Sequence, residues 1–157
     1  MPLSAEMLEK LDFYVQQHYR RASFSLRLAG KHKPTLEEIE AAIKEKEIFT
    51  EYFFALLAEK GLSDVEAYKK ARVDRRIFSK IRSQKDYMPS KKTLLAFVIA
   101  LELDLDEANE LLEHGGYFLS HARKDDVIIE YFLEHHCYDF DLINEALIHY
   151  GCSMLGG

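Results

Sequence analysis

Apolar residues recur every three or four positions along most of the chain, which is the spacing of amphipathic α-helices. Ser, Thr or Asp, which favour helix N-caps, stand just before several of these segments, and glycines follow some of them. The pattern predicts short helices joined by short polar turns. The expected helices cover residues 4–19, a stretch that begins at 35, then 52–60, 63–71, 74–82, 90–103, 104–114 (with 106 as an alternative start), 125–136 and 139–150.

Length and composition favour an all-α fold. The chain has 157 residues, of which 7 are Gly and 3 are Pro, too few for the many turns of a β-sandwich. We expect one compact multi-helix domain in three segments: an N-terminal helical extension with a connector (1–49), a central core (50–118) and a C-terminal helical pair (119–157). Thr50 is expected to cap or kink the chain before the helix at 52–60.

The sequence shows no sign of export or of a membrane segment. No apolar run follows the first basic residues, and no stretch reaches ~18 uninterrupted apolar residues. The two cysteines, Cys137 and Cys152, are too few for a disulfide framework. We expect a cytoplasmic protein that does not contact membranes.

Residues 62–101 carry the most informative motif. A polar cap opens a short helix, and a turn that ends in Val and a capping Asp leads into a second helix with two fixed apolar positions. The residues are Ser63, Val73-Asp74, Phe78, Ile81, Pro89-Ser90, Thr93-Leu94-Leu95 and Ala100-Leu101. This segment resembles the helix-turn-helix of the Cro/CI (XRE, lambda-repressor-like) family. The resemblance implies a fold built around a helix-turn-helix, with the second helix in the major groove of DNA.

Two positions depart from the family pattern. The family usually has Gly in the turn, where this chain has Arg72, so we expect Arg72 to bear the steric cost of a left-handed backbone. The first helix normally presents a small Ala to the second, but the aligned residue is Tyr68, with Ala67 beside it. Both departures favour an alternative in which the fold is kept without DNA binding.

The second helix has two distinct faces. On a 3.6-residue repeat, Ile77, Phe78 and Ile81 share one face, and Arg76, Ser79, Lys80 and Ser83 form the opposite stripe. Arg or Lys reads guanine in the major groove, and Ser reads bases more loosely. The candidate base contacts are therefore Arg76, Ser79 and Lys80 in the helix Asp74–Arg82. The candidate phosphate contacts are Ser63, Arg75, Arg82, Lys85, Lys91 and Lys92.

Charge is distributed very unevenly along the chain. The whole chain has a net charge of −6, which taken alone argues against a nucleic-acid partner. Residues 69–92, however, hold ten basic and two acidic residues, a net +8, so the remainder carries −14. One basic face could therefore meet phosphate while the acidic remainder orients the molecule. The alternative is that the basic segment pairs with the acidic C-terminal part, within the chain or in a second copy.

Other chemistry finds little support. His135, His136, Cys137, His149 and Cys152 include zinc-ligand types, but no Cys-x-x-Cys pair is present and adjacent histidines on a helix point about 100° apart. The chain also lacks a Gly-rich phosphate loop, a Gly-x-Ser-x-Gly elbow and a His-Glu-x-x-His helix. We expect no metal site, no cofactor and no enzymatic activity.

The two C-terminal helices are apolar on nearly all sides, which predicts deep packing or an apolar surface left for a partner. Homodimerisation through this pair is the preferred hypothesis, since dimers address two half-sites of double-stranded DNA. The sequence thus favours a DNA-binding helix-turn-helix protein that regulates transcription. The alternative is a non-enzymatic protein–protein interaction module with a similar fold, in bacterial stress or phage defence.

Overall fold

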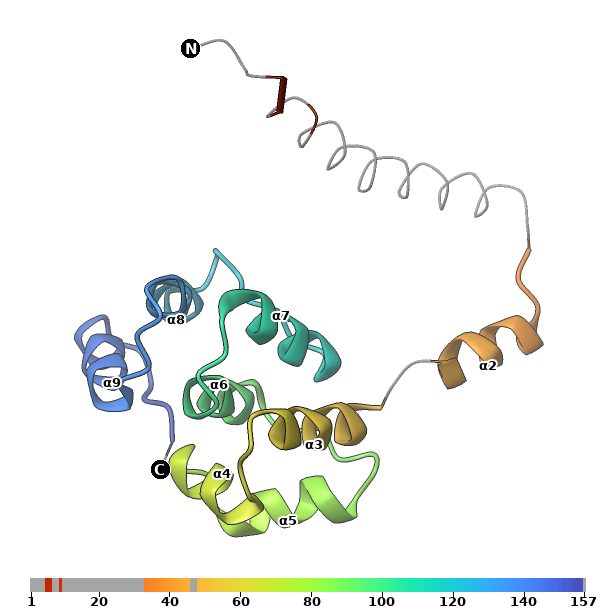
Figure 1. Ribbon diagram of the computed structural model, residues 1–157, viewed down its shortest axis with the longest axis horizontal. Coiled ribbons are helices and arrows are strands. Elements are labelled where there is room, and N and C mark those ends of the chain that lie inside the picture. Colours follow the sequence, from red (N-terminus) through yellow and green to blue (C-terminus); the bar gives the residue numbers. More distant parts are fainter. Residues whose placement is uncertain (1–4, 7–8, 10–32, 46–47, 157) are drawn as a thin grey trace. The chain divides into compact units, whose positions relative to one another are not determined.

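The computed structural model describes residues 5–6, 9, 33–45 and 48–156, which contain eight α-helices and no strand (Figure 1). The expected all-α class is therefore confirmed. The chain divides into two units, Met1–Lys46 and Glu47–Gly157, and the second unit holds both the expected core segment and the C-terminal helical pair. The helix expected over 4–19 and the connector over 20–34 lie almost entirely outside the described residues.

The first unit contributes one described helix, α2 (Leu36–Glu45). Thr35 caps it as expected, because the Glu38 amide donates to Thr35 Oγ1 at 3.2 Å and the Thr35 amide donates to Glu38 Oε2 at 3.2 Å. Such reciprocal bonds satisfy backbone groups that the helix itself leaves unpaired. Leu36 and Ile43 lie exposed on α2.

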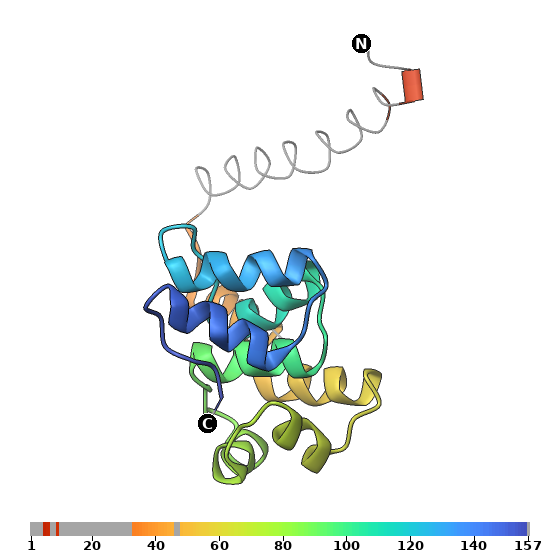
Figure 2. The same ribbon diagram turned by 90° about the vertical axis from the view of Figure 1, so that its left-hand side faces the viewer.

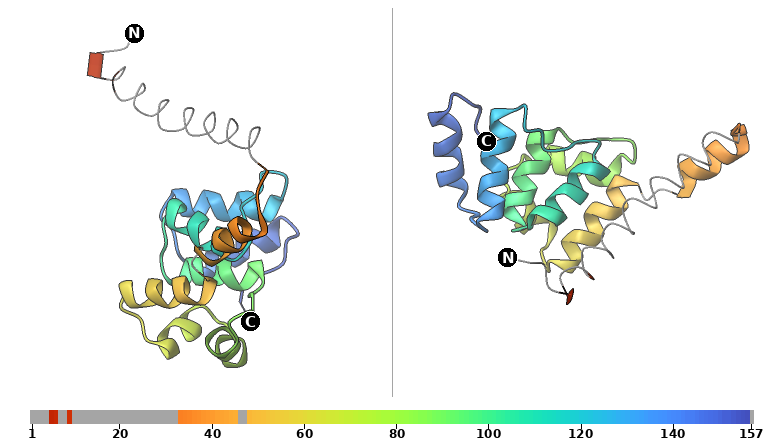
Figure 3. Two further views of the ribbon diagram at one scale, coloured as in Figure 1. Left: turned by 90° about the vertical axis from the view of Figure 1, so that its right-hand side faces the viewer. Right: turned by 90° about the horizontal axis from the view of Figure 1, so that it is seen from above.

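The second unit packs its helices around α6. The order along the chain is α3 (Phe49–Glu59), α4 (Asp64–Lys70), α5 (Arg75–Ser83), α6 (Lys91–Ala100), α7 (Leu105–His114), α8 (Lys124–Glu134) and α9 (Phe140–His149). α6 contacts α4 and α7, α7 also contacts α3 and α8, and α8 lies beside α9 (Figures 2 and 3). The α4–α5 segment is therefore at one end of the unit, and the α8–α9 pair covers another side.

The core explains the central place of α6. Every residue from Leu94 to Ala100 is buried, as expected for a helix that is apolar all round. Phe97 meets Phe53 of α3 and Phe78 of α5, with ring centroids 4.9 Å and 6.1 Å apart. Each buried phenylalanine contributes about 1.5–3 kcal/mol relative to an exposed one. The aromatic cluster thus fixes α5 against the rest of the unit.

Most helix starts follow the polar caps that the sequence indicated. Side-chain oxygens accept a backbone amide in the first turn of α4, α5, α6, α7 and α9, and the capping residues are Ser63, Asp74, Ser90, Asp104 and Asp139. Gly116, with φ 84°, follows the C-terminus of α7, and a left-handed residue there is easiest for glycine.

Two expected boundaries are wrong. Thr50 does not cap or kink the chain: α3 begins at Phe49, and the Thr50 hydroxyl donates to the Ile81 carbonyl at 3.4 Å. The helix expected to reach Leu103 ends at Ala100, because Glu102 adopts a left-handed φ of 53° and the Leu103 amide donates to the Val98 carbonyl.

Within the described residues, no helix has the length and apolar character needed to cross a membrane.

Candidate nucleic-acid interface

The α4–α5 segment consists of two short helices joined by the four residues 71–74. Arg72 has φ 57° in this turn, which confirms that it takes the left-handed conformation expected at the family's glycine position. The Val73 amide closes the turn by donating to the Tyr68 carbonyl at 2.9 Å. Ala67 is fully buried, while Tyr68 is half-buried with its ring 5.6 Å from that of Phe78.

The two faces of α5 lie as the periodicity predicted. Phe78 and Ile81 are 4% and 0% exposed, and Ile77 is half-buried. Arg76, Ser79, Lys80 and Ser83 are exposed on the opposite side. The structure thus brings the three candidate base contacts together on one exposed stripe.

Arg76 lies at the N-terminus of α5, next to the capping residue Asp74. The Arg76 amide donates to Asp74 Oδ1 at 2.7 Å, and its guanidinium Nε and Nη2 lie 3.3 Å from Oδ1 and Oδ2. The hydrogen bonds from the Arg76 side chain and amide hold the pKa of Asp74 below its ordinary value. The same carboxylate raises the pKa of Arg76, which remains a cation that is largely exposed to solvent.

Ser79 and Lys80 occupy the middle of the stripe. Ser79 accepts the Ser83 hydroxyl on its backbone carbonyl at 2.8 Å, which leaves its own side chain exposed. Lys80 extends toward Tyr87, with Nζ 5.9 Å from the ring centroid. This contact is a weak cation–π interaction, so the ammonium group is not held in place by an acid.

The expected phosphate contacts fall into two groups. Arg75, Lys85 and Lys92 are exposed and form no ion pair with any described residue, and exposed Ser63 caps α4 by accepting the Glu66 amide at 3.2 Å. Arg82 instead bonds Asp64 Oδ2 at 2.5 Å. Its guanidinium also lies 4.1 Å from the centroid of the Phe54 ring. Arg82 thus fastens the end of α5 to α4 and α3.

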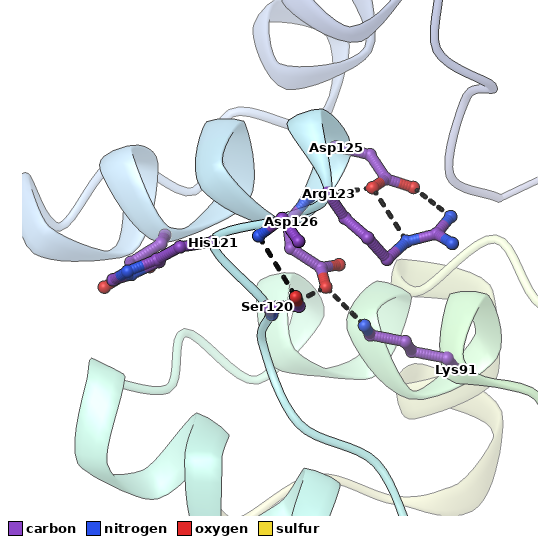
Figure 4. Close-up of polar contacts among 8 residues, drawn as sticks. Lys91, Ser120, His121, Arg123, Asp125 and Asp126 are labelled. Atoms are coloured by element: carbon purple, nitrogen blue, oxygen red, sulfur yellow. Dashed lines mark hydrogen bonds and ion pairs between the residues drawn. The ribbon is translucent and has the colours of Figure 1, made fainter.

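Lys91 is also engaged within the fold (Figure 4). Its Nζ lies 2.5 Å from Oδ2 of Asp126, a residue of α8 that is only 1% exposed. The same Oδ2 accepts the Ser120 amide at 2.9 Å. Arg123 and Asp125 form a neighbouring ion pair at 3.0 Å. Lys91 therefore joins the start of α6 to α8, a role that its position in the basic segment did not indicate.

Arg72 has a similar long-range role that the sequence did not reveal. Its Nη1 lies 2.9 Å from Asp141 Oδ1, and its guanidinium carbon lies 4.6 Å from the centroid of the Phe140 ring. Both partners are at the start of α9. The charge distribution left open a pairing between the basic segment and the acidic C-terminal part, but it did not indicate which residues pair, because periodicity describes only one helix at a time.

Some of the basic residues in 69–92 form ion pairs within the fold, and others do not. Arg72 and Lys91 pair with acids of the C-terminal part, and Arg76 and Arg82 pair with nearby acids. The other basic residues of the segment are exposed and form no ion pair within the described part of the chain. They are Lys69, Lys70, Arg75, Lys80, Lys85 and Lys92. A positive surface thus remains over α4, α5 and the start of α6.

Two open hollows adjoin the turn between α4 and α5. One, of about 340 Å³, is lined by Asp74, Ile77 and Lys92, and the other, of about 400 Å³, is lined by Glu145 and Ile148. They share Arg72, Met154 and Gly156 as lining residues. The C-terminal tail therefore lies between these hollows, next to the turn.

The α8–α9 pair both packs deeply and leaves apolar side chains exposed. Ile129, Leu133, Ile143 and Leu147 are at most 1% exposed. The exposed apolar residues of the two helices are Val127, Tyr131, Leu142 and Ile148. The expected homodimer through this pair stays a prediction.

The histidines and cysteines near the C-terminus are dispersed. Among the described residues, no three His, Cys, Asp or Glu side chains lie close enough together to hold a metal ion. His135 uses Nδ1 in a 2.7 Å contact with the Tyr131 carbonyl of its own helix.

Comparisons of the chain with protein-family models, with curated proteins and with solved structures find no match.

Proposed function

We propose that the protein binds double-stranded DNA as a divergent helix-turn-helix protein of the Cro/CI type and regulates transcription. The observation that carries the proposal is the exposed stripe of α5. A short capped helix, fixed by Phe78 and Ile81 in the core, presents Arg76, Ser79 and Lys80 to solvent. An exposed helix face of this composition fits the width and the acceptor groups of the major groove.

In this proposal Lys80 and Arg76 contact guanine and Ser79 contacts bases less specifically. Arg76 is oriented by Asp74 in the unbound protein, and DNA acceptors compete with that carboxylate for the guanidinium. Arg75, Lys85 and Lys92 are the phosphate contacts, with Ser63 at the start of α4. Arg82 and Lys91 serve the fold, because each joins its own helix to others: Arg82 contacts Asp64 of α4 and Phe54 of α3, and Lys91 pairs with buried Asp126 of α8.

The proposal is tested by titrating labelled duplex DNA with the protein at two salt concentrations. Several phosphate contacts predict a loss of affinity of orders of magnitude between ~50 and ~200 mM salt. The double variant Arg76→Gln, Lys80→Gln should weaken binding at least ~10-fold, since each base contact contributes about 1–3 kcal/mol. Lys124→Gln, at an exposed lysine of α8 outside the proposed contacts, is the control for lost charge and should bind nearly as the parent does.

A second candidate function is protein docking, and the two hollows beside the turn between α4 and α5 favour it. Their shared lining of Arg72 and Met154 makes a concave surface at the turn, where a flat surface would suffice for DNA. No detectable binding to duplex DNA at ~50 mM salt would favour this candidate over the first.

A further inference from the structure

The turn between α4 and α5 is tied to α9 through Arg72. Arg72 holds a left-handed φ of 57°, a conformation that is costly for any residue with a Cβ. Its guanidinium meets α9 twice, through the 2.9 Å ion pair with Asp141 and the contact over the Phe140 ring at 4.6 Å. Glycine would relieve the backbone but could make neither contact.

The C-terminal tail packs on the same residues. Asn144 of α9, only 8% exposed, donates from Nδ2 to the Leu155 carbonyl at 3.0 Å and accepts the Leu155 amide at 2.8 Å. This pair of bonds places Gly156 against the turn. A Cβ on Gly156 would lie 2.9 Å from Arg72 Cβ and 3.2 Å from Phe140 Cε1. The tail thus fits closely only because this residue has no side chain.

We infer that Arg72 is a positioning residue for the DNA site, through which α9 and the tail hold the turn and set the direction of α5. This inference rests on the proposed function. The turn residues determine how α5 leaves α4, and the groups that lie against the Arg72 side chain, from Phe140, Asp141 and Gly156, all belong to the C-terminal part. α9 and the tail are then an integral part of the DNA-binding unit, and α9 is not only a surface for a second copy.

The first test measures hydrogen exchange at the Val73 amide, whose bond to Tyr68 closes the turn. Asp141→Asn removes the charge partner of Arg72 and should accelerate this exchange ~2-fold, a modest factor because the Asp141 side chain is 83% exposed and an exposed ion pair stabilises only weakly. Glu145→Gln makes the same charge change on the same helix, at an exposed residue without an ion pair, and should leave the exchange unchanged.

Arg72 itself is tested with two variants and a backbone control. Arg72→Gly should also accelerate exchange of the Val73 amide, although glycine relieves the left-handed backbone. In Arg72→Lys the exchange rate should lie between those of Arg72→Gly and the parent, because lysine keeps the charge but not the planar guanidinium. Glu102→Gly relieves the same kind of backbone at an exposed residue with φ 53°. It should leave Val73 exchange unchanged.

The second test measures affinity for duplex DNA. Loss of an acid should strengthen binding electrostatically, as expected for Glu145→Gln. Asp141→Asn should instead bind DNA more weakly than Glu145→Gln, because Arg72 keeps only its contact with Phe140 and the turn holds α5 less firmly. Unchanged Val73 exchange in both Asp141→Asn and Arg72→Gly would overturn the inference, whether or not DNA binds. Faster exchange with DNA affinity equal to that of Glu145→Gln would overturn the positioning role alone, whereas a parent protein that binds no DNA would overturn the proposed function.

Discussion

Replacing Lys91 with methionine should destabilise the protein far more than the same change at its neighbour Lys92. Lys91→Met leaves the Asp126 carboxylate, whose side chain is 2% exposed, with the Ser120 amide as its remaining donor. Removal of one partner from a buried ion pair costs about 3–5 kcal/mol. The Lys91 side chain is 23% exposed, so water can reach the site, and the amide bond persists. We therefore expect a loss of about 2–3 kcal/mol.

The assay is urea unfolding followed by far-UV circular dichroism. Lys92→Met, at an exposed residue with no ion pair, should change the free energy of unfolding by no more than about 0.5 kcal/mol. The double variant Lys91→Met, Asp126→Leu should regain much of the loss, because no charge stays buried without a partner. Equal midpoints for Lys91→Met and Lys92→Met would refute the assignment of Lys91 to the fold.

Salt titration of DNA binding separates the two lysines in a second way. A phosphate contact contributes about 0.9 to the slope of log affinity against log salt. Lys92→Met should reduce the slope by about that amount, and Lys91→Met should leave it unchanged while the variant remains folded. A reduced slope for Lys91→Met alone would show that Lys91 reaches phosphate after all.

Three further predictions concern other parts of the molecule. The pKa of Asp74, measured by NMR, should rise toward its ordinary value in Arg76→Ala, and an unchanged pKa would contradict the pairing. Because the folded-state pKa of Asp74 is lowered, the pair stabilises the fold at pH values above the ordinary pKa, and this contribution is lost as the pH falls through the folded-state pKa. Gly115→Ala should cost about 1–3 kcal/mol in thermal or urea unfolding, since a Cβ there would overlap Cδ1 of fully buried Leu94; an unaltered midpoint would contradict that packing. Light scattering should give a dimer mass at micromolar concentration and a monomer mass for Tyr131→Glu, and a monomeric parent would exclude the dimer.

Local signals were sufficient to predict much of the fold. Ser63, Asp74 and Ser90 each cap the helix that follows, because a cap acts on amides two or three residues away. The end of α6 was not predicted, because Glu102 takes the left-handed conformation that a glycine usually adopts after a helix end. The residue type at this position therefore did not indicate the end of the helix.

The site was predictable only as far as one helix determines it. Periodicity separated the exposed stripe of α5 from its buried face, and the structure agrees. It could not show which basic residues are already paired, because the partner of Lys91 lies 35 residues away. The partner of Arg72 is likewise on α9. Such pairs depend on how helices pack, which no single segment encodes.

The most direct test of the proposed function is the titration of duplex DNA with the parent protein and with the Arg76→Gln, Lys80→Gln variant. The parent should bind at ~50 mM salt and lose orders of magnitude in affinity by ~200 mM. The variant should keep the circular dichroism spectrum of the parent and bind at least ~10-fold more weakly, whereas Lys124→Gln should bind nearly as the parent does. No binding by the parent at low salt, or equal binding by the parent and the double variant, would contradict the assignment of α5 as the DNA-contacting helix.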